Sequence, residues 1–264
     1  MESNHAIADA HAAPESASAP ESILAPAPET RRLTTILFDL DGTLRANEPE
    51  GFEAFIDYAG RSGLVLTPEQ IVLCERAVHR YWADGAQVAN HLARFDERGF
   101  WVNYNQVLLD AMGVEDYGDR AHRIQDCFED YRPVDVLFAE TPEVLRSLKE
   151  EGYVLGLVSN RDSDLGPLVK QYGIAEYFAF TLSGGQAKSF KPDARIFRLA
   201  LEMAGHPLAS QTLYVGDNYY ADALGAQSVG IEALLIDPRD IFKDLYDKRV
   251  KQLNEVLEFI RAAR

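Results

Sequence analysis

The sequence predicts an α/β protein built on a doubly wound parallel sheet, with a helical domain inserted after the first strand. From residue 134 onward, short apolar runs alternate with helix-like segments. This alternation is typical of a parallel sheet covered by helices on both faces. One more apolar run, residues 34–38, precedes this region. Residues 48–133, which lie between the two, carry helical patterns and no strand signal longer than a few residues.

The N-terminal segment is predicted to be a disordered tail over residues 1–32. Residues 1–30 contain acidic side chains but no lysine or arginine, and they are rich in alanine, proline and serine. Such a segment buries too little apolar surface to offset the entropy lost on ordering. It has neither the basic start and apolar core of a secretory signal nor the arginines of a transit peptide.

The inserted segment is interpreted as a helical domain, residues 48–133. Helices are expected over residues 50–61, 87–112 and 119–131, and a further helix begins at Thr67. Thr67 and Gln70 form a capping box with Pro68 at the first helical position.

The α/β domain is expected to comprise residues 33–47 and 134–264. Its further strands are predicted at residues 153–159, 178–183, 212–217 and 232–237. Its helices are predicted at residues 141–151, 163–172, 193–204 and 220–228, with a last helix that carries Val250, Leu253, Leu257 and Ile260 on one stripe.

Charge and composition exclude several classes of protein. The 264 residues include 26 lysines and arginines against 42 acidic residues, for a net charge of −16. Such a surface repels nucleic acid phosphates and anionic membranes. No apolar run approaches the roughly 20 residues of a membrane span. Two cysteines are too few for a disulfide-built scaffold. We expect a cytoplasmic protein, monomer or dimer, without nucleic-acid or membrane partners.

Polar residues gather where the predicted strands end. They are Asp39 and Asp41 after the first strand, Ser159 and Asn160 at the end of the second, Lys191 between the third and fourth, and Asp217 and Asp222 after the fourth. In a doubly wound sheet, ligands bind beyond the carboxyl ends of the strands. We therefore expect these residues to converge on one crevice.

This set of residues favours phosphoryl transfer with Mg²⁺. Clustered carboxylates repel one another unless a cation neutralises them, and Mg²⁺ prefers oxygen ligands together with phosphate and water. An aspartate can attack phosphorus, and a second carboxylate two residues on could protonate the leaving oxygen and then activate water. The sequence has no histidine and cysteine cluster with zinc spacing.

The same residues resemble a known family. DLDGT at residues 39–43, the Ser-Asn pair, the Lys-Pro pair and GDNYYADALGA at residues 216–226 are similar to the four motifs of the haloacid dehalogenase (HAD) superfamily. They occur in the same order over about residues 33–236. The resemblance implies a Rossmann-like core with an α-helical cap between the first and second motifs, where the inserted segment lies.

The resemblance also implies a role for each motif residue. The nucleophile would be Asp39 and the general acid/base Asp41. Mg²⁺ would be bound by Asp39, the main-chain carbonyl of Asp41 and Asp217, with Asp222 as a further metal-site residue that helps through water or by supporting Asp217. The phosphoryl group would be held by Ser159, Asn160 and Lys191. The implied reaction is hydrolysis of a small phosphorylated metabolite through an aspartyl phosphate.

Other reactions of the family remain alternatives. A sugar-phosphate mutase shares all four motifs, and an inactive binding or regulatory relative would keep the fold. Dehalogenation does not need Asp41, and phosphonate hydrolysis uses a cap lysine, whereas residues 48–133 contain none. Phosphoglycolate, a sugar phosphate, a nucleotide and pyrophosphate are all compatible substrates.

Several residues also have ordinary explanations when taken alone. Asp41 before Gly42 is typical of a turn, Ser159 of a helix cap, and Lys191 of a surface lysine. Lys188 is a second candidate for the lysine of the site. Arg45 is a candidate for substrate contact, and the segment His91–Asn105 is interpreted as the substrate-facing surface of the cap.

Overall fold

The structure, a computed structural model, describes residues 32–114 and 119–262. The predicted disordered tail therefore lies outside the described residues, apart from Arg32.

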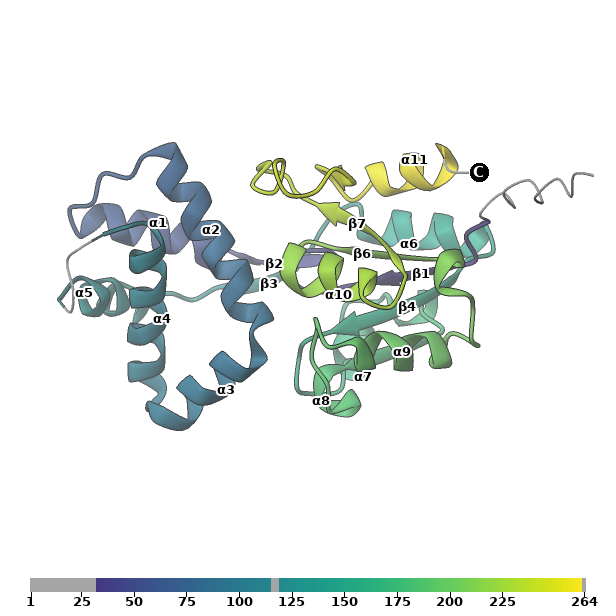
Figure 1. The fold of residues 1–264 in the computed structure, drawn as a ribbon, viewed down its shortest axis with the longest axis horizontal. Coiled ribbons are helices and arrows are strands. Elements are labelled where there is room, and N and C mark those ends of the chain that lie inside the picture. The colour runs from purple at the N-terminus through teal and green to yellow at the C-terminus, as the bar shows by residue number, and fades with distance from the viewer. Residues whose placement is uncertain (1–31, 115–118, 263–264) are drawn as a thin grey trace, which may run out of the picture. The chain divides into compact units, whose positions relative to one another are not determined.

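A six-stranded sheet in the order β5-β4-β1-β6-β7-β8 forms the centre of the fold (Figure 1). All neighbouring strands of this sheet are parallel, so the predicted doubly wound parallel sheet is confirmed. The strands are β1 (Thr35–Phe38), β4 (Val154–Ser159), β5 (Phe180–Ser183), β6 (Thr212–Gly216), β7 (Glu232–Ile236) and β8 (Arg249–Val250).

Helices cover both faces of the sheet because successive residues of its strands point to opposite sides. Ile36 and Phe38 of β1 pack on one face with α6 (Thr141–Glu150) and α11 (Glu255–Ala262). Leu37 packs on the other face with α9 (Ala194–Met203) and α10 (Leu224–Gln227). The helices of this region are α6 (Thr141–Glu150), α7 (Gly166–Gln171), α8 (Gly184–Ala187), α9 (Ala194–Met203), α10 (Leu224–Gln227) and α11 (Glu255–Ala262), with 3₁₀ turns at Ala175–Tyr177 and Ala209–Gln211.

A separate group of helices follows the first motif and has its own apolar core around Phe55, Leu108 and Ile124. These inserted helices are α1 (Gly51–Arg61), α2 (Pro68–Ala83), α3 (Gly85–Arg94), α4 (Glu97–Ala111) and α5 (Asp119–Phe128). Two short strands connect them to the sheet region and pair antiparallel, β2 (Arg45–Glu48) and β3 (Val134–Leu137). Figure 1 shows the inserted helices gathered at one side of the sheet, with β2 and β3 leading to them.

Three element predictions differ from the structure. The single helix expected over residues 87–112 is two helices, because the Asp96 side chain accepts a hydrogen bond from Gly99 N and starts a new one. The helix expected over 220–228 begins as a π-helical turn, Tyr219–Ala223. Val250 lies in β8, and the last helix starts only at Glu255.

Helix α2 of the inserted group contacts the loop that follows β7. Arg76 Nε donates to Ile241 O at 2.5 Å, and Arg239 Nε donates to Glu75 Oε1 at 2.7 Å. The loop itself is held by buried Asp237, which accepts from the main-chain N–H groups of Ile241 and Phe242 at 2.9 Å each. Asp237 thus fixes the surface on which α2 rests.

Among the described residues, no helix combines the length and the apolar character needed to cross a membrane.

Asp237→Ala should cost about 3 kcal/mol of stability, because it leaves two buried N–H groups without acceptors and removes a partner of Arg249. Urea denaturation of both proteins measures this difference. Asp247→Ala, a substitution of an exposed residue at the end of the same loop, is the matched control. Equal midpoints for Asp237→Ala and the control would show that Asp237 does not hold the loop.

Candidate active site

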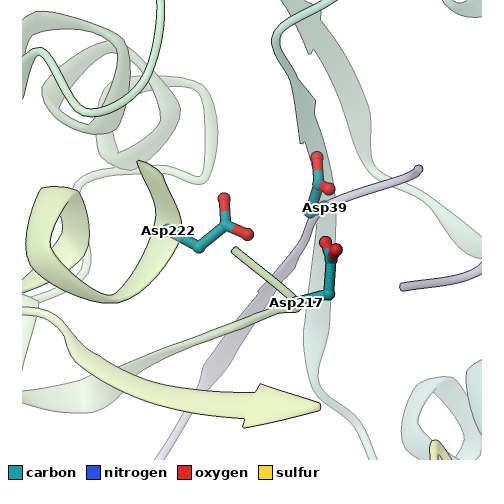
Figure 2. Close-up of side chains that lie close together, drawn as sticks. All are labelled: Asp39, Asp217 and Asp222. Atoms are coloured by element: carbon teal, nitrogen blue, oxygen red, sulfur yellow. The ribbon is translucent and has the colours of Figure 1, made fainter. Parts of the chain in front are cut away.

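Three carboxylates meet at the carboxyl ends of β1 and β6. Asp39 directly follows β1, Asp217 directly follows β6, and Asp222 lies in the π-helical turn after it. One oxygen of each can be chosen so that all three lie within 4.8 Å of one another. Figure 2 shows the three side chains close together, with Asp222 approaching the other two from the side. The structure therefore brings together Asp39 of the first motif and Asp217 and Asp222 of the fourth.

Two glycines make this close approach possible. Gly42 has a φ of +82°, and a Cβ there would collide with the carboxylate of Asp217. A Cβ on Gly216 would collide with the carboxylate of Asp222. The π-helical turn that carries Asp222 is closed by the Asn218 side chain, which accepts from Tyr220 N and Ala221 N at 3.0 Å each. Such turns occur frequently at functional sites.

Lys191 inserts its ammonium group into this cluster. Its Nζ donates to Asp39 Oδ1 and Asp222 Oδ1 at 2.6 Å each and to the Tyr214 hydroxyl at 3.0 Å. Only 3% of the side chain is exposed. Lys188, the other candidate, is exposed at the end of α8. The structure therefore places Lys191, not Lys188, among the carboxylates.

Asn160 contacts the main chain of Lys191, and Ser159 lies just before it at the end of β4. Asn160 Nδ2 donates to Lys191 O at 2.9 Å, and Lys191 N donates to Asn160 Oδ1 at 2.6 Å. The Asn160 side chain thus fixes the main chain that presents the lysine. Ser159 is buried at the end of β4, and its Oγ accepts from Arg161 N at 3.3 Å. Phosphate contact by Ser159 and Asn160 stays a prediction.

The electrostatics of the cluster are dominated by burial. Burial raises the pKa of Asp39 to about 7, and the charges of Asp222 and Asp41 act in the same direction while Lys191 opposes them. Burial also raises the pKa of Asp217 well above its ordinary value, with Asp39 and Asp222 adding to it. Burial alone would lower the pKa of Lys191, but Asp222 and Asp39 outweigh it and raise that pKa well above the usual value. One ammonium is therefore too little positive charge for three ionised carboxylates.

A divalent cation fits this arrangement. The donors are carboxylate oxygens, the ligands that Mg²⁺ prefers, and they converge where negative charge exceeds positive charge. The three side chains could hold such an ion, with Thr43 Oγ1 steadying Asp217 Oδ1 at 3.3 Å. No histidine or cysteine belongs to this group of described residues, so its chemistry differs from that of a zinc site.

Asp41 lies apart from the three carboxylates and faces two arginines. Arg161 Nε and Nη2 donate to its two oxygens at 2.8 Å each, and Arg45 Nη1 donates to Oδ1 at 2.6 Å. Burial alone would raise the pKa of Asp41, but the hydrogen bonds and charge of Arg161 and the charge of Arg45 lower it below its ordinary value. Asp41 is therefore held as a carboxylate.

Arg45 is not free for the substrate contact that the sequence suggested. Its side chain is 3% exposed, and its guanidinium contacts Asp41, Asn47 and Asp135. Arg45 thus links the first motif to the two connecting strands β2 and β3.

The expected cap surface, His91–Asn105, is largely engaged within the inserted helices. His91 Nδ1 contacts the Tyr81 hydroxyl and Asn103, and Arg98 pairs with Asp126 and Glu129. His79 of α2 lies nearer the carboxylates instead, with its Nδ1 3.8 Å from Asp217 Oδ2. Burial lowers the pKa of His79 to about 4, so the ring is neutral near pH 7.

Sequence reasoning missed His79 and Arg161. Arg161 directly follows the Ser-Asn pair, and this adjacency was the available signal. His79 carries no comparable signal, because its position depends on how α2 rests on the π-helical turn, where Asn218 Nδ2 donates to His79 O at 2.9 Å.

The chain is similar in sequence and fold to known proteins. Haloacid dehalogenase-like hydrolase domain-containing protein 3 of Danio rerio is 26% identical over 207 residues, which cover 78% of this chain and 85% of that protein. Phosphoglycolate phosphatase of Pseudomonas fluorescens is 26% identical over 204 residues, covering 76% of this chain and 68% of that protein. A solved HAD phosphatase from Thermococcus onnurineus shares the fold, with a TM-score of 0.51 at 21% identity over 86% of this chain and 98% of that one.

The family itself follows from a broader match. The model of the haloacid dehalogenase-like hydrolases matches residues 33–230, more than half of the chain. This range contains all four motifs, residues 39–43, 159–160, 191–192 and 216–226. The chain belongs to the haloacid dehalogenase-like hydrolase family.

Proposed function

We propose that this protein is a Mg²⁺-dependent phosphatase that hydrolyses a small phosphorylated metabolite through an aspartyl phosphate on Asp39. The observation that carries the proposal is the contact between Asp39 and Lys191 at 2.6 Å, inside a cluster with two further carboxylates. This arrangement presents one carboxylate oxygen beside a fixed positive charge, where a phosphoryl group needs both a nucleophile and neutralisation.

The side chains divide the reaction between them. Asp39 attacks phosphorus, and a new O–P bond forms as the ester O–P bond breaks. Asp41 gives a proton to the leaving oxygen and then takes one from the water that hydrolyses the aspartyl phosphate. Arg45 and Arg161 favour the ionised form of Asp41, which suits the second step. For the first step, Asp41 must carry a proton.

The bound metal would be held by Asp39, Asp217 and the main-chain carbonyl of Asp41, with Asp222 in support. When bound, Mg²⁺ supplies positive charge that offsets the carboxylates and the phosphoryl oxygens. Lys191 neutralises part of the same charge and keeps Asp39 in place. Ser159 and Asn160 are proposed to border the phosphoryl oxygens at the end of β4.

The helices α1–α5 are proposed to act as a cap, with domain boundaries at residues 33–47, 48–133 and 134–264. His79 is the residue of this group that approaches the carboxylates, at 3.8 Å from Asp217. Helix α2 would thereby limit access of water to the phosphoryl site. The cytoplasmic location stays a prediction.

The relatives support phosphate-ester chemistry. One of them is named a phosphoglycolate phosphatase, at 26% identity. No arrangement among residues 32–114 and 119–262 favours the sugar-phosphate mutase. Asp39, Asp41, Lys191 and Asp217 are all retained, which argues against an inactive relative. Release of inorganic phosphate distinguishes a phosphatase from the two alternatives. A mutase converts one sugar phosphate to another without net release, and an inactive relative releases none.

Asp39→Asn should abolish phosphate release while leaving the fold intact, because the amide is nearly isosteric but a far weaker nucleophile. The loss should reach several orders of magnitude in kcat. Phosphate release from an aryl phosphate with Mg²⁺ measures it, and Asp247→Asn, at an exposed residue away from the site, is the control. Activity of Asp39→Asn within about tenfold of wild type would contradict the proposal.

Asp41→Asn should impair the reaction most for esters with poor leaving groups, since these need a proton on the departing oxygen. General acid–base catalysis typically contributes about 10²–10⁴-fold. Comparing kcat for an aryl phosphate and an alkyl phosphate tests this. An equal loss of kcat for both esters would show that Asp41 is not the general acid.

Mg²⁺ should stabilise the protein increasingly as pH rises from about 6 to about 8. Asp39 has a folded pKa near 7, above its unfolded value, so the metal-free fold loses stability as pH rises through 7. Mg²⁺ binds the ionised carboxylates and offsets this loss. Melting temperatures with and without Mg²⁺ check the trend, and Asp217→Asn should remove most of the Mg²⁺ effect. A Mg²⁺ effect that is independent of pH and of Asp217 would place the ion elsewhere.

A further inference from the structure

Arg161 combines contact with the site and exposure to solvent. It stands at the carboxyl end of β4, directly after Ser159 and Asn160. Its Nε and Nη2 donate to the two oxygens of Asp41 at 2.8 Å each, yet 33% of its side chain is exposed. These bonds occupy the side edge of the planar guanidinium and fix its orientation.

The other edge of the same guanidinium, formed by Nη1 and Nη2, is available to bind a ligand. Arg161 Nη1 and the second N–H of Nη2 have no hydrogen-bond acceptor within the part of the chain that the structure describes. Asp135, the other acid that influences Arg161, pairs with Arg45 Nη2 at 2.6 Å. Two parallel N–H groups on a planar fork match the two oxygens of a carboxylate.

The other cationic side chains near the site are less available to bind a substrate anion. Lys191 and Arg45 have side chains that are each 3% exposed, and both are bonded to carboxylates. Four arginines of the inserted helices bond to other residues: Arg76 to Asp244, Arg80 to Tyr220, Arg98 to Asp126 and Glu129, and Arg61 to Asp57. Among the described cations that contact Asp39, Asp41, Asp217 or Asp222, Arg161 is the most exposed.

We propose that Arg161 is a specificity-determining residue that binds a carboxylate on the leaving group, so that the preferred substrates are phosphate esters of small hydroxy acids. The inference rests on the proposed phosphatase function, in which Asp41 contacts the leaving oxygen. A guanidinium bonded to Asp41 borders that oxygen. In a 2-hydroxy acid ester, one carbon separates the ester oxygen from the carboxylate, so both can be reached together.

The test compares two esters that differ by one group, 2-phosphoglycolate and ethyl phosphate. Wild-type protein should prefer 2-phosphoglycolate in kcat/KM, and Arg161→Gln should reduce this preference by about 10- to 100-fold, the effect of a charge-assisted pair. The reduction should arise mainly from a higher KM for 2-phosphoglycolate. Arg161→Lys should retain part of the preference, because it keeps the charge but not the fork.

Arg198→Gln, at an exposed arginine of α9, is the matched control and should leave the preference unchanged. Glycolate is also a better leaving group than ethanol, so the decisive quantity is the change in preference between wild type and Arg161→Gln. A melting temperature near that of wild type shows that the variant is folded.

Two results would overturn the inference while leaving the proposed function intact. If Arg161→Gln lowers kcat/KM for both esters by one common factor, Arg161 only positions Asp41. If its preference for 2-phosphoglycolate equals that of wild type, the carboxylate binds elsewhere. If wild-type protein releases phosphate from neither ester nor from an aryl phosphate, the proposed function fails and the inference fails with it.

Discussion

The buried ammonium of Lys191 between Asp39 and Asp222 is the interaction on which the site depends. Two carboxylates of this cluster lie at strand ends and one in a π-helical turn. Their mutual repulsion therefore tends to push the ends of β1 and β6 and this turn apart. Lys191 offsets part of it at 2.6 Å from two of them. The lysine is in turn fixed by the Asn160 side chain, which donates a hydrogen bond to Lys191 O and accepts one from Lys191 N. A misplaced lysine would leave buried carboxylates unpaired, which is costly.

Charge is divided between two neighbouring groups of side chains. Asp39, Asp217 and Asp222 have one ammonium among them, which leaves room for a divalent cation. Asp41 instead faces two guanidinium groups. The first group therefore suits a metal and a phosphoryl group, and the second has the positive charge to attract an anion.

The sequence predicts the site better than it predicts the surroundings. Asp39, Asp41 and Asp217 could be placed because parallel strands bring their carboxyl ends to one edge, and Lys191 because it precedes proline in the third motif. His79 could not, since its contact depends on how α2 packs against Asn218. The break at Asp96 was missed because the apolar periodicity continues across a local side-chain cap. The pairing of β2 with β3 escaped prediction because each strand has only four residues and β2 is largely polar.

The central claim, a phosphoryl group carried by Asp39, is tested most directly by trapping it. Borohydride reduces an aspartyl phosphate to homoserine, which peptide mass spectrometry can locate. Protein mixed with a phosphate ester and Mg²⁺ and then reduced should carry homoserine at residue 39, and protein without the ester should not. Turnover of the ester without modification of Asp39, or modification of Asp217 or Asp222 instead, would contradict the assignment of the nucleophile.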